Sequence, residues 1–146
     1  MTTTALSLDE IYSLAKQTLL HNGCDEMNAE AVAKTVTHAE RDGSVSHGLF
    51  RIPGYTAALR SKKVKGDARP TNNFRTQNAI RVDGDYGFAP TAIQVGIPAL
   101  VETTNKHGVG VRNNQSQKCF FSRKNRKSRP QETGFYVFPG LKWFVS

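Results

Sequence analysis

Cysteine is scarce in this chain, with only Cys24 and Cys119 among 146 residues. The two lie far apart and neither belongs to a C-x-x-C pair, so the spacing supports neither a disulfide framework nor a zinc site. The chain also lacks any apolar run near the ~20 residues that a membrane span requires, and its first residues lack the segments of a secretory signal. We therefore expect free thiols, no metal site, no membrane association and a cytoplasmic protein.

Acidic residues are scarce beyond Val111, where residues 112–146 hold eight Lys and Arg but only one acidic residue, Glu132. Residues 1–111 are nearly balanced, with 12 basic and 11 acidic side chains, so the net charge of +8 describes the C-terminal part. That part also contains seven of the 13 aromatic residues. It shows no helical or strand periodicity, and this composition is typical of an irregular or disordered basic tail.

Two helices are predicted at the start of the chain. Ser7 and Glu10 have the spacing of a capping box, and apolar residues then recur at helical intervals until Gly23. A second, alanine-rich run starts at Asp25 and closes at Gly43. These two segments predict amphipathic helices that pack closely on each other.

A third helical stretch covers about residues 47–62, and Pro53 complicates it. Proline has no N–H to donate to the preceding turn. Either the helix kinks at this point, or it begins at Pro53 and residues 46–52 form a separate turn. The sequence leaves both alternatives open.

The next part of the chain mixes strand and helix signals. Residues 65–75 are expected to form a loop, 79–82 a strand, 83–87 a turn, 88–106 a helix and 108–111 the start of a second strand. A strand, a helix and a strand in this order predict a βαβ unit with parallel strands. The glycines of the turn do not form G-x-G-x-x-G, so they do not predict a phosphate-binding loop.

Together these segments predict an α/β protein in three parts. They are an N-terminal helical segment over residues 1–64, an incomplete βαβ unit over 65–111 and the basic aromatic-rich tail over 112–146. Because the unit stops after one crossover, the sheet of the α/β domain is expected to be incomplete.

Ser46, His47 and Arg51 place a hydroxyl, a titratable imidazole and a permanent cation within six residues. A histidine can protonate an imine nitrogen or a carbonyl oxygen near neutral pH, and an arginine can hold a carboxylate with two parallel hydrogen bonds. If residues 46–54 are helical, His47 and Arg51 share one face and Ser46 stands at the helix entrance. Each residue also has a structural alternative, as a helix-starting histidine, an N-cap or a solvated cation.

Three segments stand in a fixed order along the chain: residues 39–55 (AERDGSVSHGLFRIPGY), 82–90 (VDGDYGFAP) and 107–111 (HGVGV). Together they resemble the N-terminal part of the malate/L-lactate dehydrogenase family of NAD(P)-dependent oxidoreductases, which is unrelated to the Rossmann-type lactate dehydrogenases. Within that family the first segment is most similar to the Δ1-pyrroline-2-carboxylate/Δ1-piperideine-2-carboxylate reductases. Those enzymes reduce cyclic imines to proline and pipecolate.

The resemblance implies a role for each residue of the cluster. Ser46 would orient the histidine or relay a proton to it, His47 would donate a proton to the imine nitrogen, and Arg51 would bind the substrate carboxylate. It also implies NADPH or NADH as cofactor, a small-molecule carboxylate as substrate and a homodimer for the full-length family. It assigns no cofactor-binding residue in this chain.

The resemblance is expected to end after Val111, because the Asn-Ser-x-His-x-Gly-like segment of the family is not continued there. We therefore expect a truncated or frameshifted product, inactive by itself. Two further interpretations remain: a fragment of a malate- or lactate-type 2-hydroxy acid dehydrogenase, and a small basic module that binds nucleic acid through Arg123–Arg129. Nucleic acid is the weaker alternative because no binding fold accompanies that run. A non-catalytic domain that pairs through its helices is a third possibility.

Overall fold

A computed structural model describes residues 5–115 and 136–137, so most of the expected tail lies outside the described residues. The first helix, α1 (Leu8–His21), begins at the predicted capping box. The Glu10 N–H donates to Ser7 Oγ over 3.2 Å, and the Ser7 N–H donates to Glu10 Oε2 over 2.7 Å. The second helix, α2 (Glu26–Arg41), follows as expected and packs along α1.

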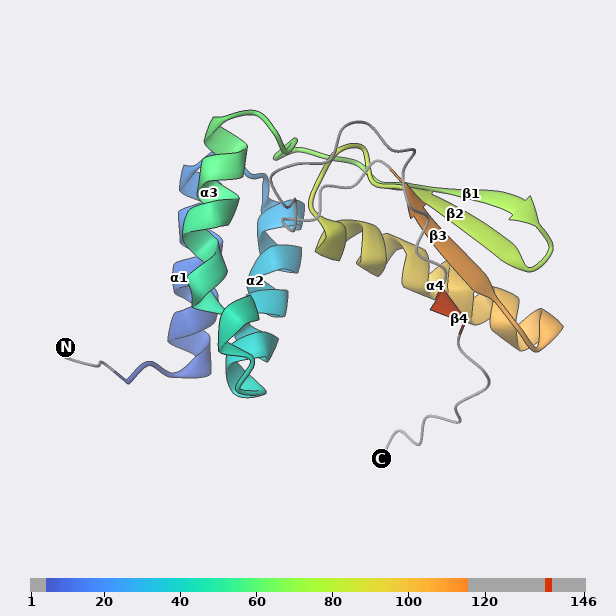
Figure 1. The fold of residues 1–146 in the computed structure, drawn as a ribbon, viewed down its shortest axis with the longest axis horizontal. Helices are drawn as coiled ribbons and strands as arrows, with labels where there is room; N and C mark the ends of the chain where they lie inside the picture. Colours follow the sequence, from blue (N-terminus) through green and yellow to red (C-terminus); the bar gives the residue numbers. More distant parts are fainter. Residues whose placement is uncertain (1–4, 116–135, 138–146) are drawn as a thin grey trace, which may run out of the picture.

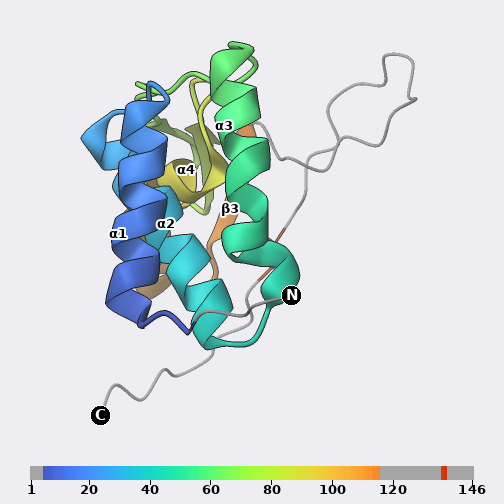
Figure 2. The same ribbon diagram turned by 90° about the vertical axis from the view of Figure 1, so that its left-hand side faces the viewer.

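The core between the helices consists of small and aliphatic side chains. Its buried members from α1 and α2 are Ile11, Ala15, Leu19, Ala29, Val32, Ala33 and Val36. The small side chains of α2 let the helices approach closely, and burial of the larger ones stabilises the layer by ~1.5–3 kcal/mol for each aliphatic side chain. Figure 2 shows α1, α2 and α3 as one helical layer in front of α4 and the sheet.

Pro53 resolves the ambiguity of the third stretch. Two short 3-10 turns, η1 (Val45–His47) and η2 (Leu49–Arg51), precede the helix α3 (Ile52–Arg60). The proline occupies the first turn of α3, where its missing N–H has no helical partner to lose. The alternative with a separate turn is confirmed. A single helix with His47 and Arg51 on one face is wrong.

The remaining elements are β1 (Thr71–Thr76), β2 (Ala79–Asp83), α4 (Ala89–His107), β3 (Val111–Gln115) and β4 (Tyr136–Val137). The strands form one sheet in the order β1-β2-β3-β4. The β2 and β3 strands are parallel and flank α4 in sequence, which confirms the predicted βαβ unit and the α/β class. Figure 1 shows α4 along one face of the sheet, where Ala92 packs on Ile80 and Val82.

Three details of the segment that contains the sheet and α4 differ from what the sequence predicts. The segment 65–75, expected to be a loop, contains most of β1, which pairs antiparallel with β2. The expected strand at 108–111 starts only at Val111, because Gly108 ends α4 in the left-handed conformation with φ 76°. From Val111 the strand continues to Gln115, so the expectation of irregular structure from residue 112 is wrong for the first residues of the tail.

Cys24 lies in the joint between α1 and α2 and is a free, buried thiol, as expected. Its Sγ–H donates to the Gly66 carbonyl over 3.5 Å. Burial, followed by the neighbouring Asp25 carboxylate, raises the pKa of the Cys24 thiol to about 12. A thiol in that state is a packing group and a poor nucleophile. Cys119 lies outside the described residues.

Asp25 caps α2 and connects it to the loop before β1. Its carboxylate accepts hydrogen bonds from the Asn28 N–H (3.0 Å), from Asn28 Nδ2 (2.7 Å) and from the Arg69 guanidinium. Burial alone would raise the pKa of this carboxyl. The hydrogen bonds from Asn28 and Arg69 outweigh burial, so its pKa lies below the ordinary value.

We expect Asp25→Ala to lower the free energy of unfolding by about 1–3 kcal/mol near neutral pH. Because the folded-state pKa is below the unfolded one, the contribution of the carboxylate is present above about pH 4 and is lost as pH falls through the folded pKa. Urea unfolding at neutral and at strongly acidic pH measures this. Asp25→Asn, which keeps a cap but loses the charge, serves as the matched control. A difference between wild type and Asp25→Ala that persists undiminished in acid would contradict the assignment.

Candidate active site

The residues singled out from the sequence lie where α2 ends and α3 begins, in the teal turns at the lower end of the helical layer in Figure 1. The helix α2 stops at Arg41, and the chain then passes through η1 and η2 before α3 starts. Two consecutive short turns present successive side chains in different directions. The site is therefore built from turns between two packed helices.

Ser46 and His47 are in direct contact. Ser46 Oγ lies 2.9 Å from His47 Nδ1, and Ser44 Oγ approaches the same nitrogen at 3.5 Å. Ser46 lies inside η1, so the alternative in which Ser46 is an N-cap does not apply; Ser44 takes the position before this turn and makes no side-chain cap bond. A hydroxyl can donate to Nδ1 of a neutral imidazole and accept from Nδ1–H of an imidazolium. Both contacts are made at Nδ1, which directs the chemistry of the ring to Nε2.

Arg51 contacts the same turn through a hydrogen bond that helical i, i+4 spacing does not predict. Its Nε donates to the main-chain carbonyl of Ser46 over 2.8 Å. The guanidinium is thereby folded back beside the residues that precede it in the chain. The structure brings Ser46, His47 and Arg51 together, although they share no helix face.

Glu40 is a site residue that sequence reasoning missed. Its Oε1 accepts a hydrogen bond from the Leu49 N–H over 2.6 Å, linking the last turn of α2 to η2. A Cβ atom at Gly48 would lie 2.0 Å from the same oxygen, so a larger residue at this position would displace the Glu40 carboxylate. The available signal was the Glu-Arg-Asp-Gly sequence at the end of α2. That sequence does not reveal the contact between Glu40 and Leu49, which are nine residues apart.

We expect Glu40→Ala to loosen these turns, because the partly buried Leu49 N–H then loses a charged acceptor. The free energy of unfolding should fall by about 1.5–3 kcal/mol, and the Leu49 amide should exchange faster with solvent. Glu40→Gln keeps an acceptor oxygen and should recover most of both losses. Hydrogen exchange followed by NMR measures the effect at Leu49. Equal exchange rates in Glu40→Ala and wild type would show that the carboxylate does not hold the turn.

The surroundings of the cluster are open and partly apolar. Ser46 and His47 are exposed, and Val45 and Phe50 beside them are 66% and 76% exposed. Large apolar side chains that cluster on a surface mark a binding or docking area. The cluster therefore has the polar groups of an active site, but the described residues do not enclose it.

The described residues hold no group of three or more His, Cys, Asp or Glu that could bind a metal. The turn at 83–87 does not fit a phosphate either. Asp85 accepts hydrogen bonds from Lys65 Nζ (2.7 Å) and from the Arg69 N–H (3.0 Å), and these contacts lower the pKa of its carboxyl. A carboxylate at this place would repel a phosphate. Within the described part of the chain no helix is long and apolar enough to cross a membrane.

Comparison with known proteins places this geometry in context. The sequence model described as malate/L-lactate dehydrogenase matches residues 6–119, beyond Val111, where the resemblance was expected to end. A Δ1-pyrroline-2-carboxylate reductase of Ancylobacter novellus is 41% identical over 104 residues, covering 71% of this chain and 30% of that protein. A Δ1-pyrroline-2-carboxylate/Δ1-piperideine-2-carboxylate reductase of Pseudomonas aeruginosa is 36% identical over the same length, covering 71% and 31%.

Solved structures of related enzymes match the fold of this chain. The Δ1-piperideine-2-carboxylate reductase of Pseudomonas syringae pv. tomato matches with a TM-score of 0.76 at 31% identity, over 79% of this chain and 35% of that one. The malate dehydrogenase of Entamoeba histolytica matches with a TM-score of 0.74 at 28% identity, over 82% and 33%. The chain thus spans about three tenths of the length of its curated relatives.

The helical layer and the βαβ unit define part of an α/β fold shared with the Δ1-piperideine-2-carboxylate reductase structure. The matched residues cover most of the chain, and the chain belongs to the malate/L-lactate dehydrogenase family. This membership supports a nicotinamide cofactor in general.

Proposed function

We propose that residues 44–51 supply the proton donor and the carboxylate-binding group of a reductase that acts on cyclic imine 2-carboxylates. The observation that carries the proposal is the 2.9 Å contact between Ser46 Oγ and His47 Nδ1, with Arg51 bonded to the same turn. The names of the reductases that match this chain support the substrate class. Nothing among the described residues is assigned to hold the cofactor.

Each member of the cluster has a defined task in this reaction. When bound, a nicotinamide cofactor supplies a hydride to the carbon of the C=N bond. His47 donates a proton from Nε2 to the nitrogen as negative charge develops there, a contribution worth ~10²–10⁴ in rate. Ser46 keeps the ring oriented in both protonation states through Nδ1. Arg51 binds the carboxylate next to the reacting carbon and fixes the face presented to the hydride.

A 2-hydroxy acid dehydrogenase is the second candidate, favoured by the similarity to the Entamoeba malate dehydrogenase structure. The same cluster would then exchange a proton with a substrate oxygen. Parallel assays with Δ1-piperideine-2-carboxylate and with oxaloacetate and pyruvate separate the two.

We also propose that the chain does not turn over substrate by itself, since its cluster is exposed and catalysis of this kind needs water excluded. The purified 146-residue chain, mixed with NADPH or NADH and Δ1-piperideine-2-carboxylate, should oxidise no cofactor above the uncatalysed rate. Micromolar NADPH binding with turnover would overturn this proposal.

A chimera tests the activity of the cluster itself. The matching 104 residues of this chain replace their counterpart in the Ancylobacter novellus reductase, so that the remaining length of that enzyme is present. We expect this chimera to reduce cyclic imine 2-carboxylates with NADPH.

We further propose that a frameshift accounts for the end of the family likeness near residue 119. Reading the coding DNA beyond that codon in the other two frames tests the frameshift. A family-like continuation with a histidine-containing segment is expected, and its absence from both frames would refute a frameshift.

A further inference from the structure

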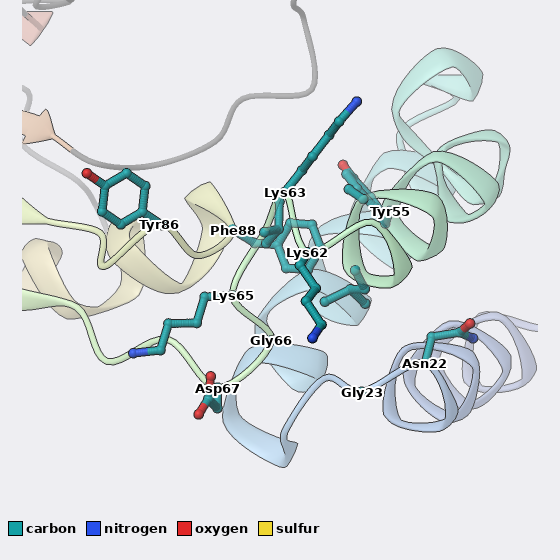
Figure 3. Close-up of a pocket in the computed structure, with 13 residues that line it drawn as sticks. Asn22, Gly23, Tyr55, Lys62, Lys63, Lys65, Gly66, Asp67, Tyr86 and Phe88 are labelled. Carbon is teal, nitrogen blue, oxygen red and sulfur yellow. The ribbon is translucent and has the colours of Figure 1, made fainter.

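A pocket of about 1080 Å³ opens at the C-terminal end of α3, whereas His47 lies before its N-terminal end. The wall is apolar: Leu59, Val64 and Phe88 are buried, and Tyr55 meets Phe88 edge-on with ring centroids 5.3 Å apart. Figure 3 shows Phe88 at the centre of the pocket with lysine side chains around it. The proposed catalytic residues do not line this pocket.

Lysines dominate the rim of the pocket. Lys65 is neutralised by Asp85 at 2.7 Å. Lys62 and Lys63 are exposed, and neither has an ion-pair partner within the described ranges. They leave the chain in different directions in Figure 3, on flexible stems that can turn toward a common anion. Asp67 is the one carboxylate in the lining, so the rim keeps a positive charge.

Strained backbone conformations occur at and beside this pocket. Lys62, Asp85 and Tyr86 have φ angles of 53°, 48° and 56°, and they are the non-glycine residues with positive φ in the described chain. Lys62 and Tyr86 line the pocket, and Asp85 holds Lys65. Each such position is strained relative to a relaxed backbone, and glycine would avoid that strain. Strain of this kind concentrates at ligand sites, because the side chains in those positions are needed there.

We propose that this pocket binds an organic phosphate with a flat apolar body. The flat body lies against Leu59 and Phe88, and the phosphate dianion is met by Lys62 and Lys63. Two lysines that can both turn toward the ligand match a dianion better than a monocarboxylate, and lysine binds phosphate as a compact point charge. The pocket has the size and the mixed lining of a small-molecule site. The inference does not rest on the proposed reductase activity.

Calorimetric titration of the full 146-residue chain with ADP tests the proposal. We expect a Kd below about 1 mM at low salt, and a loss of at least about tenfold in the double variant Lys62→Ala/Lys63→Ala. Adenosine, which lacks the phosphate, and inorganic pyrophosphate, which lacks the ring, should each bind at least about tenfold more weakly than ADP. NMR shifts on ADP addition should fall on residues 62–66 and 86–88 and leave 46–51 unmoved.

The double variant Lys34→Ala/Lys106→Ala is the matched control, since it removes the same charge from two lysines that are paired with Glu30 and Glu102. It should bind ADP like wild type. An equal loss of ADP affinity in this control would show that net charge alone explains the effect, and would contradict the proposed site. Absence of ADP binding to wild type, or pyrophosphate binding as tight as ADP, would overturn it as well.

Discussion

His47→Ala in the chimeric reductase is expected to lower kcat for Δ1-piperideine-2-carboxylate by about 10²–10⁴-fold, with KM little changed. The imidazole is needed only as the nitrogen gains charge, so its loss raises the barrier and leaves substrate binding in place. Steady-state oxidation of NADPH measures both constants. Ser46→Ala should cause a smaller loss of kcat, because the ring then lacks its hydroxyl partner at Nδ1.

His38→Ala is the matched control, because His38 is an exposed histidine near the end of α2 with no assigned role. It should keep the activity of the parent chimera. If His47→Ala retained a similar kcat, the proton would come from another group and the assignment of His47 would fail.

Arg51→Ala is expected to raise KM for the imine carboxylate by about 30–1000-fold, equivalent to the ~2–4 kcal/mol of a two-bond contact between arginine and carboxylate. Arg51→Lys should recover only part of this, since an ammonium cannot form two parallel bonds. The decisive comparison uses Δ1-pyrroline, which has the imine but no carboxylate. On that substrate the variant and the parent should perform alike.

Arg41→Ala supplies the control for general loss of positive charge, because Arg41 is exposed and paired with Asp42 at 2.8 Å. It should leave KM unchanged. An equal penalty for Arg51→Ala on substrates with and without the carboxylate would show that Arg51 only supports the turn through its bond to the Ser46 carbonyl.

The features predicted correctly from the sequence are those set by local chemistry. The capping box at Ser7 and the periodicity of α1 and α2 depend on residues within a few positions of each other. The parallel pairing of β2 with β3 also follows locally, since a helix between two strands returns the chain in the same direction.

The missed features depend on distant contacts. The polar sequence TNNFRT shows no strand pattern, and β1 forms because its main chain pairs with β2. Polar residues of β3 likewise join the sheet through β2. At the site, the three residues were found from the sequence, but their arrangement depends on two 3-10 turns and on Glu40, whose bond to Leu49 no local pattern reveals.

The most direct test of the account is the rate of NADPH oxidation by the chimera with Δ1-piperideine-2-carboxylate, compared with oxaloacetate and pyruvate. We expect the chimera to reduce the cyclic imine in preference to both oxo acids, and His47→Ala to abolish this reduction. A folded chimera that binds NADPH but leaves the imine unreduced, or that reduces an oxo acid faster, would contradict it.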